Sequence, residues 1–176
     1  MPSSFNSKRK FPRNDATIRS EGSYVLYWMQ SAHRFHYNYA LEYAVAWANK
    51  LGVPLVVYEE LHCDYPWACD RLHTFYLEMM REHLEQAAAH PAGQDGRLTY
   101  WPHVEIQPGS GDQGFRVLAR QAALAVSDEF PVFFLRERNE RMGRELGEIG
   151  VPYITIDSNG LIPLGLTEKD PYTAYV

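Results

Sequence analysis

The sequence predicts a Rossmann-like, three-layer α/β/α domain built on a five-stranded parallel sheet with strand order 3-2-1-4-5. Short apolar runs alternate along the chain with longer segments whose apolar residues recur at helical spacing. The runs are continuously apolar, which is typical of strands that are buried on both faces of a parallel sheet. The 176 residues are enough for one domain with a full core.

The first half of the chain contains two strand–helix pairs. The run Tyr-Val-Leu-Tyr-Trp-Met predicts a strand at 24–29, and an apolar stripe predicts a helix at 36–50 that Gly52 ends. Residues 55–58, Leu-Val-Val-Tyr, predict the second strand, and residues 70–88 carry apolar side chains at helical spacing.

The second half continues the alternation. In order, we expect a loop at 91–96, a strand at 98–101, a helix at 115–123, a strand at 124–127, a helix at 139–147 and a strand at 151–156. Because every strand is followed by a crossover segment, the strands should run parallel with right-handed connections.

A ligand pocket is expected where the first and fourth strands lie side by side. In this strand order the topology switches there, and open α/β sheets bind ligands at the carboxyl ends of the strands beside such a point. Met29 and Gln30 follow the first strand, and Asp128, Glu129 and Phe130 follow the fourth. The topology therefore nominates these residues as candidate binding residues.

Arg34 is a further candidate, in the loop after the first strand, with Asn38 at the start of the next helix. A helix N-terminus beside an arginine favours an anionic or carbonyl-rich ligand. Trp28, Phe35 or Phe130 could supply a stacking face. The alternative is that Arg34 forms an ion pair with Asp128 or Glu129 and holds the loops together.

The charge of the chain is uneven. The net charge is −5, so the domain as a whole is not an obvious nucleic-acid binder. Residues 1–20 are basic and rich in Pro, Ser and Asn, which predicts a mobile tail. Such a tail could contact DNA phosphates, although a merely solvated tail is more common.

The other motifs are weaker indications of function. Residues 109–114 match the dinucleotide pattern G-x-G-x-x-G, but Pro108 precedes the first glycine where a strand should run into it, which favours a flexible loop and a helix start. The candidate zinc ligands His33, His36, His62, Cys63 and Cys69 lack paired short spacings, so we expect no metal site. Because no catalytic motif is present, the chain suggests a binding or accessory domain.

Compartment signals are few. Two cysteines make no disulfide framework, and no signal peptide or apolar run of about 20 residues is present. We therefore expect a cytoplasmic protein.

Residues 24–41 resemble the opening of the class II deoxyribodipyrimidine photolyases, within the DNA photolyase/cryptochrome family. Residues 127–131, 156–163 and 168–175 resemble the end of that family's fourth strand, the segment after its fifth strand and the start of its interdomain linker. Beyond the basic tail at 1–20, the resemblance implies a photolyase-type N-terminal α/β domain at 21–165 and, at 166–176, the start of a linker to a C-terminal helical FAD domain.

This resemblance also implies a function. The family's α/β domain carries an antenna chromophore, either 8-hydroxy-5-deazaflavin or methenyltetrahydrofolate, which passes excitation to FAD in the helical domain. The full-length flavoenzyme would repair cyclobutane pyrimidine dimers in UV-damaged DNA, whereas these 176 residues alone would not be catalytic. No membrane partner is expected. The expected chromophore-binding residues are Met29, Gln30, Arg34, Asn38, Asp128, Glu129 and Phe130.

Three alternatives remain open at this point. The chain could be a cryptochrome-like photosensor domain, a stand-alone nucleotide-binding protein of the same superfold, or a purely structural domain without a ligand.

Overall fold

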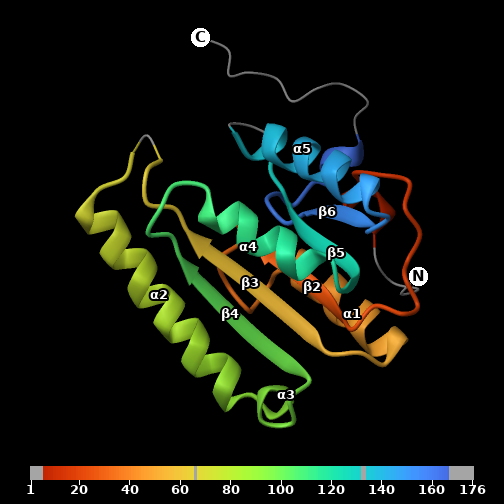
Figure 1. Ribbon diagram of the computed structural model, residues 1–176, viewed down its shortest axis with the longest axis horizontal. Helices are drawn as coiled ribbons and strands as arrows, with labels where there is room; N and C mark the ends of the chain where they lie inside the picture. The colour runs from red at the N-terminus through yellow and green to blue at the C-terminus, as the bar shows by residue number, and fades with distance from the viewer. Residues whose placement is uncertain (1–5, 66, 132–133, 167–176) are drawn as a thin grey trace.

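A six-stranded mixed sheet forms the middle layer of the domain (Figure 1). The structure is a computed structural model and describes residues 6–65, 67–131 and 134–166. The strands lie in the order β1-β6-β5-β2-β3-β4, with β1 antiparallel to β6 and the other neighbours parallel. Their bounds are β1 Lys10–Pro12, β2 Tyr24–Met29, β3 Leu55–Leu61, β4 Leu98–Val104, β5 Ala122–Glu129 and β6 Tyr153–Asp157.

The sheet corrects the prediction of five parallel strands, because β1 adds an antiparallel strand at the β6 edge. This strand is only three residues long and half-buried, so it has no apolar run that the sequence could reveal. The prediction of a mobile tail is likewise wrong for residues 6–20. Two of their basic side chains pair with acidic groups of the sheet: Arg9, which is buried, pairs with Asp157, and Arg13 pairs with Glu129.

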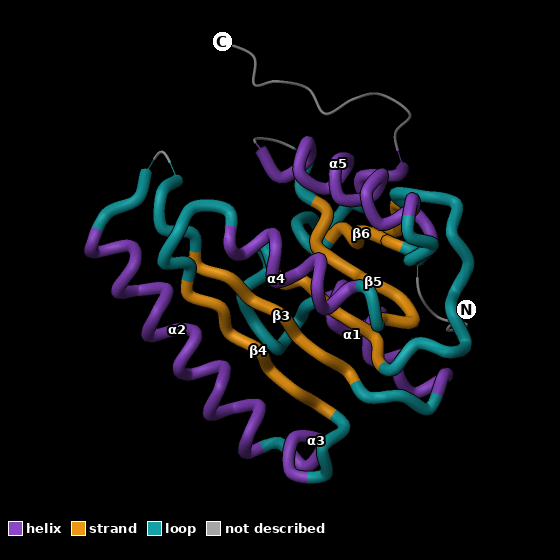
Figure 2. Tube along the Cα trace, viewed as in Figure 1, coloured by secondary structure: helices purple, strands orange, loops and turns teal. Residues whose placement is uncertain are grey.

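Helices cover both faces of the sheet, as Figures 1 and 2 show. One face packs against α1 (Tyr39–Leu51) and α2 (Asp70–Ala89), and the other packs against α4 (Ser110–Ala119) and α5 (Phe134–Glu148). The short elements are α3 (Pro91–Gln94) and the 3₁₀ helices η1 (Ser7–Arg9) and η2 (Leu164–Leu166). The three predicted layers are therefore present.

Several element boundaries differ from the predictions. The segment 91–96, expected to be a loop, contains α3, and α4 begins at Ser110 instead of 115. Residues 122 and 123 belong to β5, because their side chains are buried in the sheet. Helix α1 begins at Tyr39 because the Asn38 side chain accepts a hydrogen bond from Leu41 N and caps the helix.

Alternate residues of each central strand pack into the two apolar cores, one on each face of the sheet. From β2, Val25, Tyr27 and Met29 point toward the α1 and α2 side, whereas Leu26 and Trp28 point toward α4 and α5. Among the described residues no helix is both long and apolar enough to span a membrane. The expected linker at 166–176 lies, beyond residue 166, outside the described residues.

Candidate functional site

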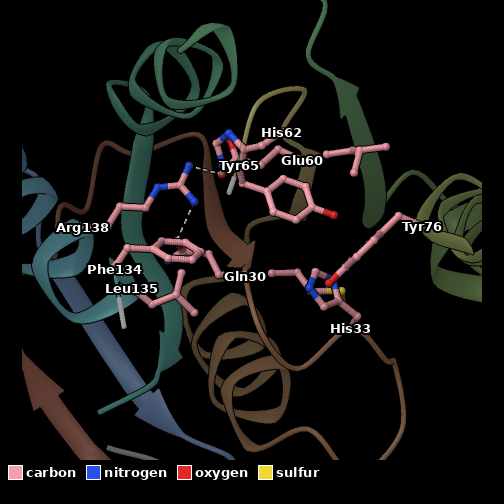
Figure 3. A pocket seen from close by; sticks show the side chains of 11 residues that line it. Gln30, His33, Glu60, His62, Tyr65, Tyr76, Phe134, Leu135 and Arg138 are labelled. Carbon is pink, nitrogen blue, oxygen red and sulfur yellow. Dashed lines mark hydrogen bonds and ion pairs between the residues drawn. The ribbon is translucent and has the colours of Figure 1, made fainter. Parts of the chain in front are cut away.

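A pocket opens at the carboxyl ends of β2 and β3 (Figure 3). Its cavity volume is about 100 Å³, less than the roughly 300–1,000 Å³ of most small-molecule sites, so a ring bound here would be only partly enclosed. Aromatic, aliphatic and charged side chains share its walls. They are Met29, Gln30, His33, Glu60, Leu61, His62, Tyr65, Tyr76, Phe134, Leu135 and Arg138.

Aromatic rings stand on opposite sides of this pocket. In Figure 3, Phe134 and Arg138 from α5 face Tyr76 from α2 and His33, with Gln30 between them. Tyr65, from the loop after β3, reaches over the same space. A flat ring could therefore contact aromatic side chains from three separate segments.

The hydroxyls of Tyr65 and Tyr76 have no hydrogen-bond partner among the residues that the structure describes. Burial raises the pKa of both tyrosines, and the nearby charge of Glu59 adds to the rise for Tyr76. Both side chains therefore stay protonated at neutral pH and can donate hydrogen bonds to a bound ligand.

Arg138 is a buried cation whose donors are already in use. Its Nε donates to Asp112 Oδ1 at 2.9 Å and its Nη1 to Gln30 Oε1 at 3.1 Å, while Nη2 donates to Glu60. The guanidinium also lies 4.3 Å from the centroid of the Trp28 ring. Arg138 therefore joins α5 to the ends of β2 and β3, and its charge is balanced within the protein.

His62 links two carboxylates at the pocket rim. Its Nε2 lies 3.2 Å from Glu60 Oε1 and its Nδ1 lies 3.3 Å from Glu105 Oε2. Burial lowers the pKa of His62, but the hydrogen bond with Glu60 and the charge of that carboxylate outweigh it, so the net pKa is raised. Both ring nitrogens are engaged.

A buried carboxylate lies behind the pocket wall. Glu59 accepts hydrogen bonds from His33 Nδ1 at 2.5 Å, His83 Nδ1 at 2.8 Å and the Tyr100 hydroxyl at 2.6 Å. Burial raises the pKa of Glu59, but the hydrogen bonds from His33 and His83 outweigh it and bring the pKa down to about 2. Glu59 is therefore a carboxylate at neutral pH and fixes the ring of His33.

Of the candidates nominated from the sequence, Met29 and Gln30 line this pocket. Arg34, Asn38, Asp128, Glu129 and Phe130 do not. Asn38 caps α1 and donates to the Tyr27 hydroxyl at 2.8 Å. The Asp128 carboxylate accepts from the backbone N–H groups of residues 30, 31 and 32, so it holds the loop after β2 in place.

The alternative ion pair of Arg34 with Asp128 or Glu129 is wrong. Arg34 donates to the Tyr37 carbonyl, while Glu129 pairs with Arg13. The proposed stacking residues also lie elsewhere, since Trp28 stacks on Phe115 at 4.0 Å in the core and Phe35 packs against the apolar cluster under α1 and α2.

The glycine motif at 109–114 has a structural role. Gly109 adopts a φ of 85° where α4 begins, and Gly111 N donates to Glu105 Oε1 at 3.2 Å. A carboxylate of the protein thus occupies the helix N-terminus where a nucleotide phosphate would bind. A Cβ at Gly111 would lie 2.3 Å from Glu60 Oε2, so close packing explains that glycine.

One group of potential metal ligands exists among the described residues, and it differs from the set weighed from the sequence. Ligand atoms of Cys63, Asp64 and Glu105 lie within 4.8 Å of one another. Glu105 already accepts from Cys63 N and Gly111 N, so few of its lone pairs are left for an ion. His33 and His36 do not belong to this group.

Sequence reasoning missed most of the pocket walls. His33, Tyr65, Tyr76, Phe134 and Arg138 come from the loops and helices around the strand ends. One signal was available, because Glu60 and His62 follow the second strand, whose end lies next to that of the first. The positions of Tyr76 on α2 and Arg138 on α5 depend on packing and left no local mark.

Comparison with known proteins adds to this geometry. No family model matches the chain. Over 154 residues, 87% of this chain, it is 30% identical to the deoxyribodipyrimidine photo-lyase of Methanothermobacter thermautotrophicus. The chain spans about a third (32%) of the length of that relative. The match covers most of the chain, as does the resemblance found in the sequence. It shows that the chain carries a photolyase-family domain.

Proposed function

We propose that the domain binds a light-absorbing antenna chromophore, in the pocket at the ends of β2 and β3, for a light-dependent DNA repair photolyase. The observation that carries this proposal is an aromatic-walled pocket at the carboxyl ends of the strands of a photolyase-family domain. An antenna needs only to be held in a defined orientation, and the pocket offers contacts for that purpose without a catalytic constellation.

The pocket chemistry supports a planar ring with polar edges. Phe134 and Tyr76 provide apolar surface on opposite sides, and the Tyr65 and Tyr76 hydroxyls are free to donate to ring carbonyls. 8-Hydroxy-5-deazaflavin and methenyltetrahydrofolate both have such a ring. Of the residues nominated from the sequence, Met29 and Gln30 remain in the proposed contact set, with Gln30 held by Arg138.

The other candidates support the site indirectly in this proposal. Asp128 and Asn38 order the loop that carries Gln30 and His33, and Glu129 anchors the N-terminal segment through Arg13. Arg34 and Phe130 lie outside the pocket lining. We do not assign either residue a direct contact with the ring.

We assign the repair chemistry itself to a region outside this domain. Because the chain corresponds in length to about a third of its photolyase relative, we assign FAD binding and the damaged-DNA site to a helical partner domain. Excitation would pass from the antenna in this domain to that flavin.

A fluorescence titration tests the proposal. The purified chain is titrated with 8-hydroxy-5-deazaflavin, methenyltetrahydrofolate, FAD and ATP in parallel. Saturable binding of the deazaflavin or the folate, with little affinity for FAD or ATP, is expected. Selective binding of ATP or FAD, or no binding of any of the four, would contradict the antenna role.

A matched pair of variants locates the site. Tyr76→Ala removes a pocket wall, and we expect at least about a fivefold loss of chromophore affinity, since stacking on an aromatic side chain contributes about 1–3 kcal/mol. Phe75→Ala is the control, because Phe75 is the adjacent residue on α2 but is 60% exposed and does not line the pocket. Equal effects of the two substitutions would place the chromophore elsewhere.

A further inference from the structure

His33 differs from the other nitrogen-bearing side chains that line the pocket. Arg138 donates to Asp112, Gln30 and Glu60, and both ring nitrogens of His62 face carboxylates. The Gln30 amide nitrogen donates to Ser127 and Asn139. His33 uses only Nδ1, and its Nε2 has no hydrogen-bond partner in the described parts of the chain.

The orientation of His33 is fixed from behind. Its Nδ1 lies 2.5 Å from Glu59 Oε1, and it must donate there because an ionised carboxylate only accepts. The side chain of Glu59 is fully buried, whereas that of His33 is 17% exposed and lines the pocket. A neutral His33 therefore keeps its proton on Nδ1 and leaves the lone pair of Nε2 for a ligand.

This pairing places a buried carboxylate directly behind the ring of His33. When Nε2 takes a proton, the ring becomes an imidazolium whose charge is stabilised by the adjacent carboxylate. In Figure 3 the His33 side chain lies beside Tyr76, across the pocket from Phe134 and Arg138. A ring held between these walls would have its edge close to His33.

We infer that His33, aligned by Glu59, accepts a proton from an acidic ring hydroxyl or ring N–H of the bound chromophore, so that the pocket selects a ring of this class and holds it as the anion. The inference rests on the proposed antenna function and narrows it to a chromophore with an ionisable ring group. In this role His33 is a binding residue and Glu59 is a positioning residue.

The proton transfer is balanced within the site. The O–H or N–H bond of the ring breaks, its electron pair remains on the ring atom, and an N–H bond forms at His33 Nε2. The products are a ring anion and an imidazolium, next to the existing carboxylate of Glu59. The protonated hydroxyls of Tyr65 and Tyr76 can then donate to the anionic ring.

Most of the other charged and titratable groups around His33 form hydrogen bonds within the protein. On the far side of Glu59, His83 of α2 and Tyr100 of β4 donate to the same carboxylate. Across the pocket, Glu60, His62 and Arg138 form hydrogen bonds with one another or with Glu105 and Asp112. Tyr76 lies edge-on to His33 at 5.2 Å between centroids. One other basic atom, Glu60 Oε2, has no hydrogen-bond partner among the described residues, but it is buried against Gly111 of α4.

The test is a pH titration of bound 8-hydroxy-5-deazaflavin, with the anion and the neutral ring distinguished by their absorption. In the wild-type domain we expect the bound ring to ionise about one pH unit or more below the free compound. His33→Asn retains a donor toward Glu59 but removes the base, so ionisation should return to the free value or above it. Glu59→Gln should give an intermediate profile.

His36→Asn is the matched control, since His36 is an exposed histidine of the same loop that does not line the pocket. Its profile should match the wild type. The wild-type domain should also bind the hydroxylated ring at least about tenfold more tightly than a 5-deazaflavin without the 8-hydroxyl, and His33→Asn should abolish that preference.

The outcomes separate the two proposals. If His33→Asn binds the deazaflavin with an unchanged ionisation profile, the role of His33 is overturned and the antenna function stands. Binding of methenyltetrahydrofolate without any deazaflavin binding would likewise overturn the role of His33 and leave the antenna function standing. If the wild-type domain binds neither chromophore, both proposals fail. Far-UV circular dichroism checks that each variant is folded. If His33→Asn is unfolded, the ionisation profile of Glu59→Gln tests the role of His33 instead.

Discussion

Replacing Asp128 by alanine tests whether this residue is structural, as its contacts indicate. Asp128 is 1% exposed, and its Oδ2 accepts from Gln30 N at 2.9 Å, Ser31 N at 2.8 Å and Ala32 N at 3.0 Å. Its Oδ1 accepts from the Tyr27 hydroxyl at 2.8 Å. The substitution therefore removes four hydrogen bonds to one buried charge.

The expected cost follows from these contacts. A hydrogen bond to a charged group contributes about 1.5–3 kcal/mol, but the contributions do not add and part of the loop can turn to water. We therefore expect Asp128→Ala to lower the free energy of unfolding by about 4 kcal/mol, which corresponds to roughly 10 °C in melting temperature for a domain of this size. Asp128→Asn keeps the side-chain volume and should cost about half as much.

The measurement is urea unfolding at pH 7, followed by far-UV circular dichroism, with the midpoint and the slope fitted separately. The control is Asp95→Ala, because the Asp95 side chain is 59% exposed and its ion pair with Arg97 lies on the surface. That variant should lose less than about 0.5 kcal/mol. A cost below about 1 kcal/mol for Asp128→Ala would refute the structural role.

Three further predictions concern stability and use the same unfolding assay. The pKa of Glu59 lies at about 2 in the folded protein, below its ordinary 4.5. Its contribution to the free energy of unfolding is therefore complete above pH 4.5 and is lost as the pH falls toward 2. This acid-sensitive part should amount to roughly 3 kcal/mol and should be absent in Glu59→Gln. Arg13→Ala leaves the buried Glu129 without its cation and should cost about 2–3 kcal/mol; an unchanged midpoint would restore the mobile-tail hypothesis. Gly111→Ala would place a Cβ 2.3 Å from Glu60 Oε2 and should cost about 2 kcal/mol, which a wild-type midpoint would contradict.

The N-terminal segment shows how composition can mislead. Arg9 and Arg13 stand among Pro, Ser and Asn residues, a composition that is typical of solvated tails. They are instead held at the β6 edge by Asp157 and Glu129. These carboxylates lie more than 100 positions away in the sequence, and buried carboxylates require a partner. Only the tertiary structure brings the partners together.

The sequence by itself determined the layered α/β architecture, because apolar runs and apolar stripes are local patterns and each pattern stabilises its own element. It also predicted a pocket at the carboxyl end of the first strand, and Met29 and Gln30 do line one, but that pocket lies at the ends of β2 and β3 and not between β2 and β5 as predicted. The tertiary structure decided the rest. Asp128 and Asn38 proved to be loop and helix supports, since their partners are backbone groups fixed by folding. The sheet places Glu59 behind His33, so that Nδ1 is bound to the carboxylate and Nε2 faces the pocket without a partner among the described residues. This contact spans 26 positions, and no local pattern encodes it.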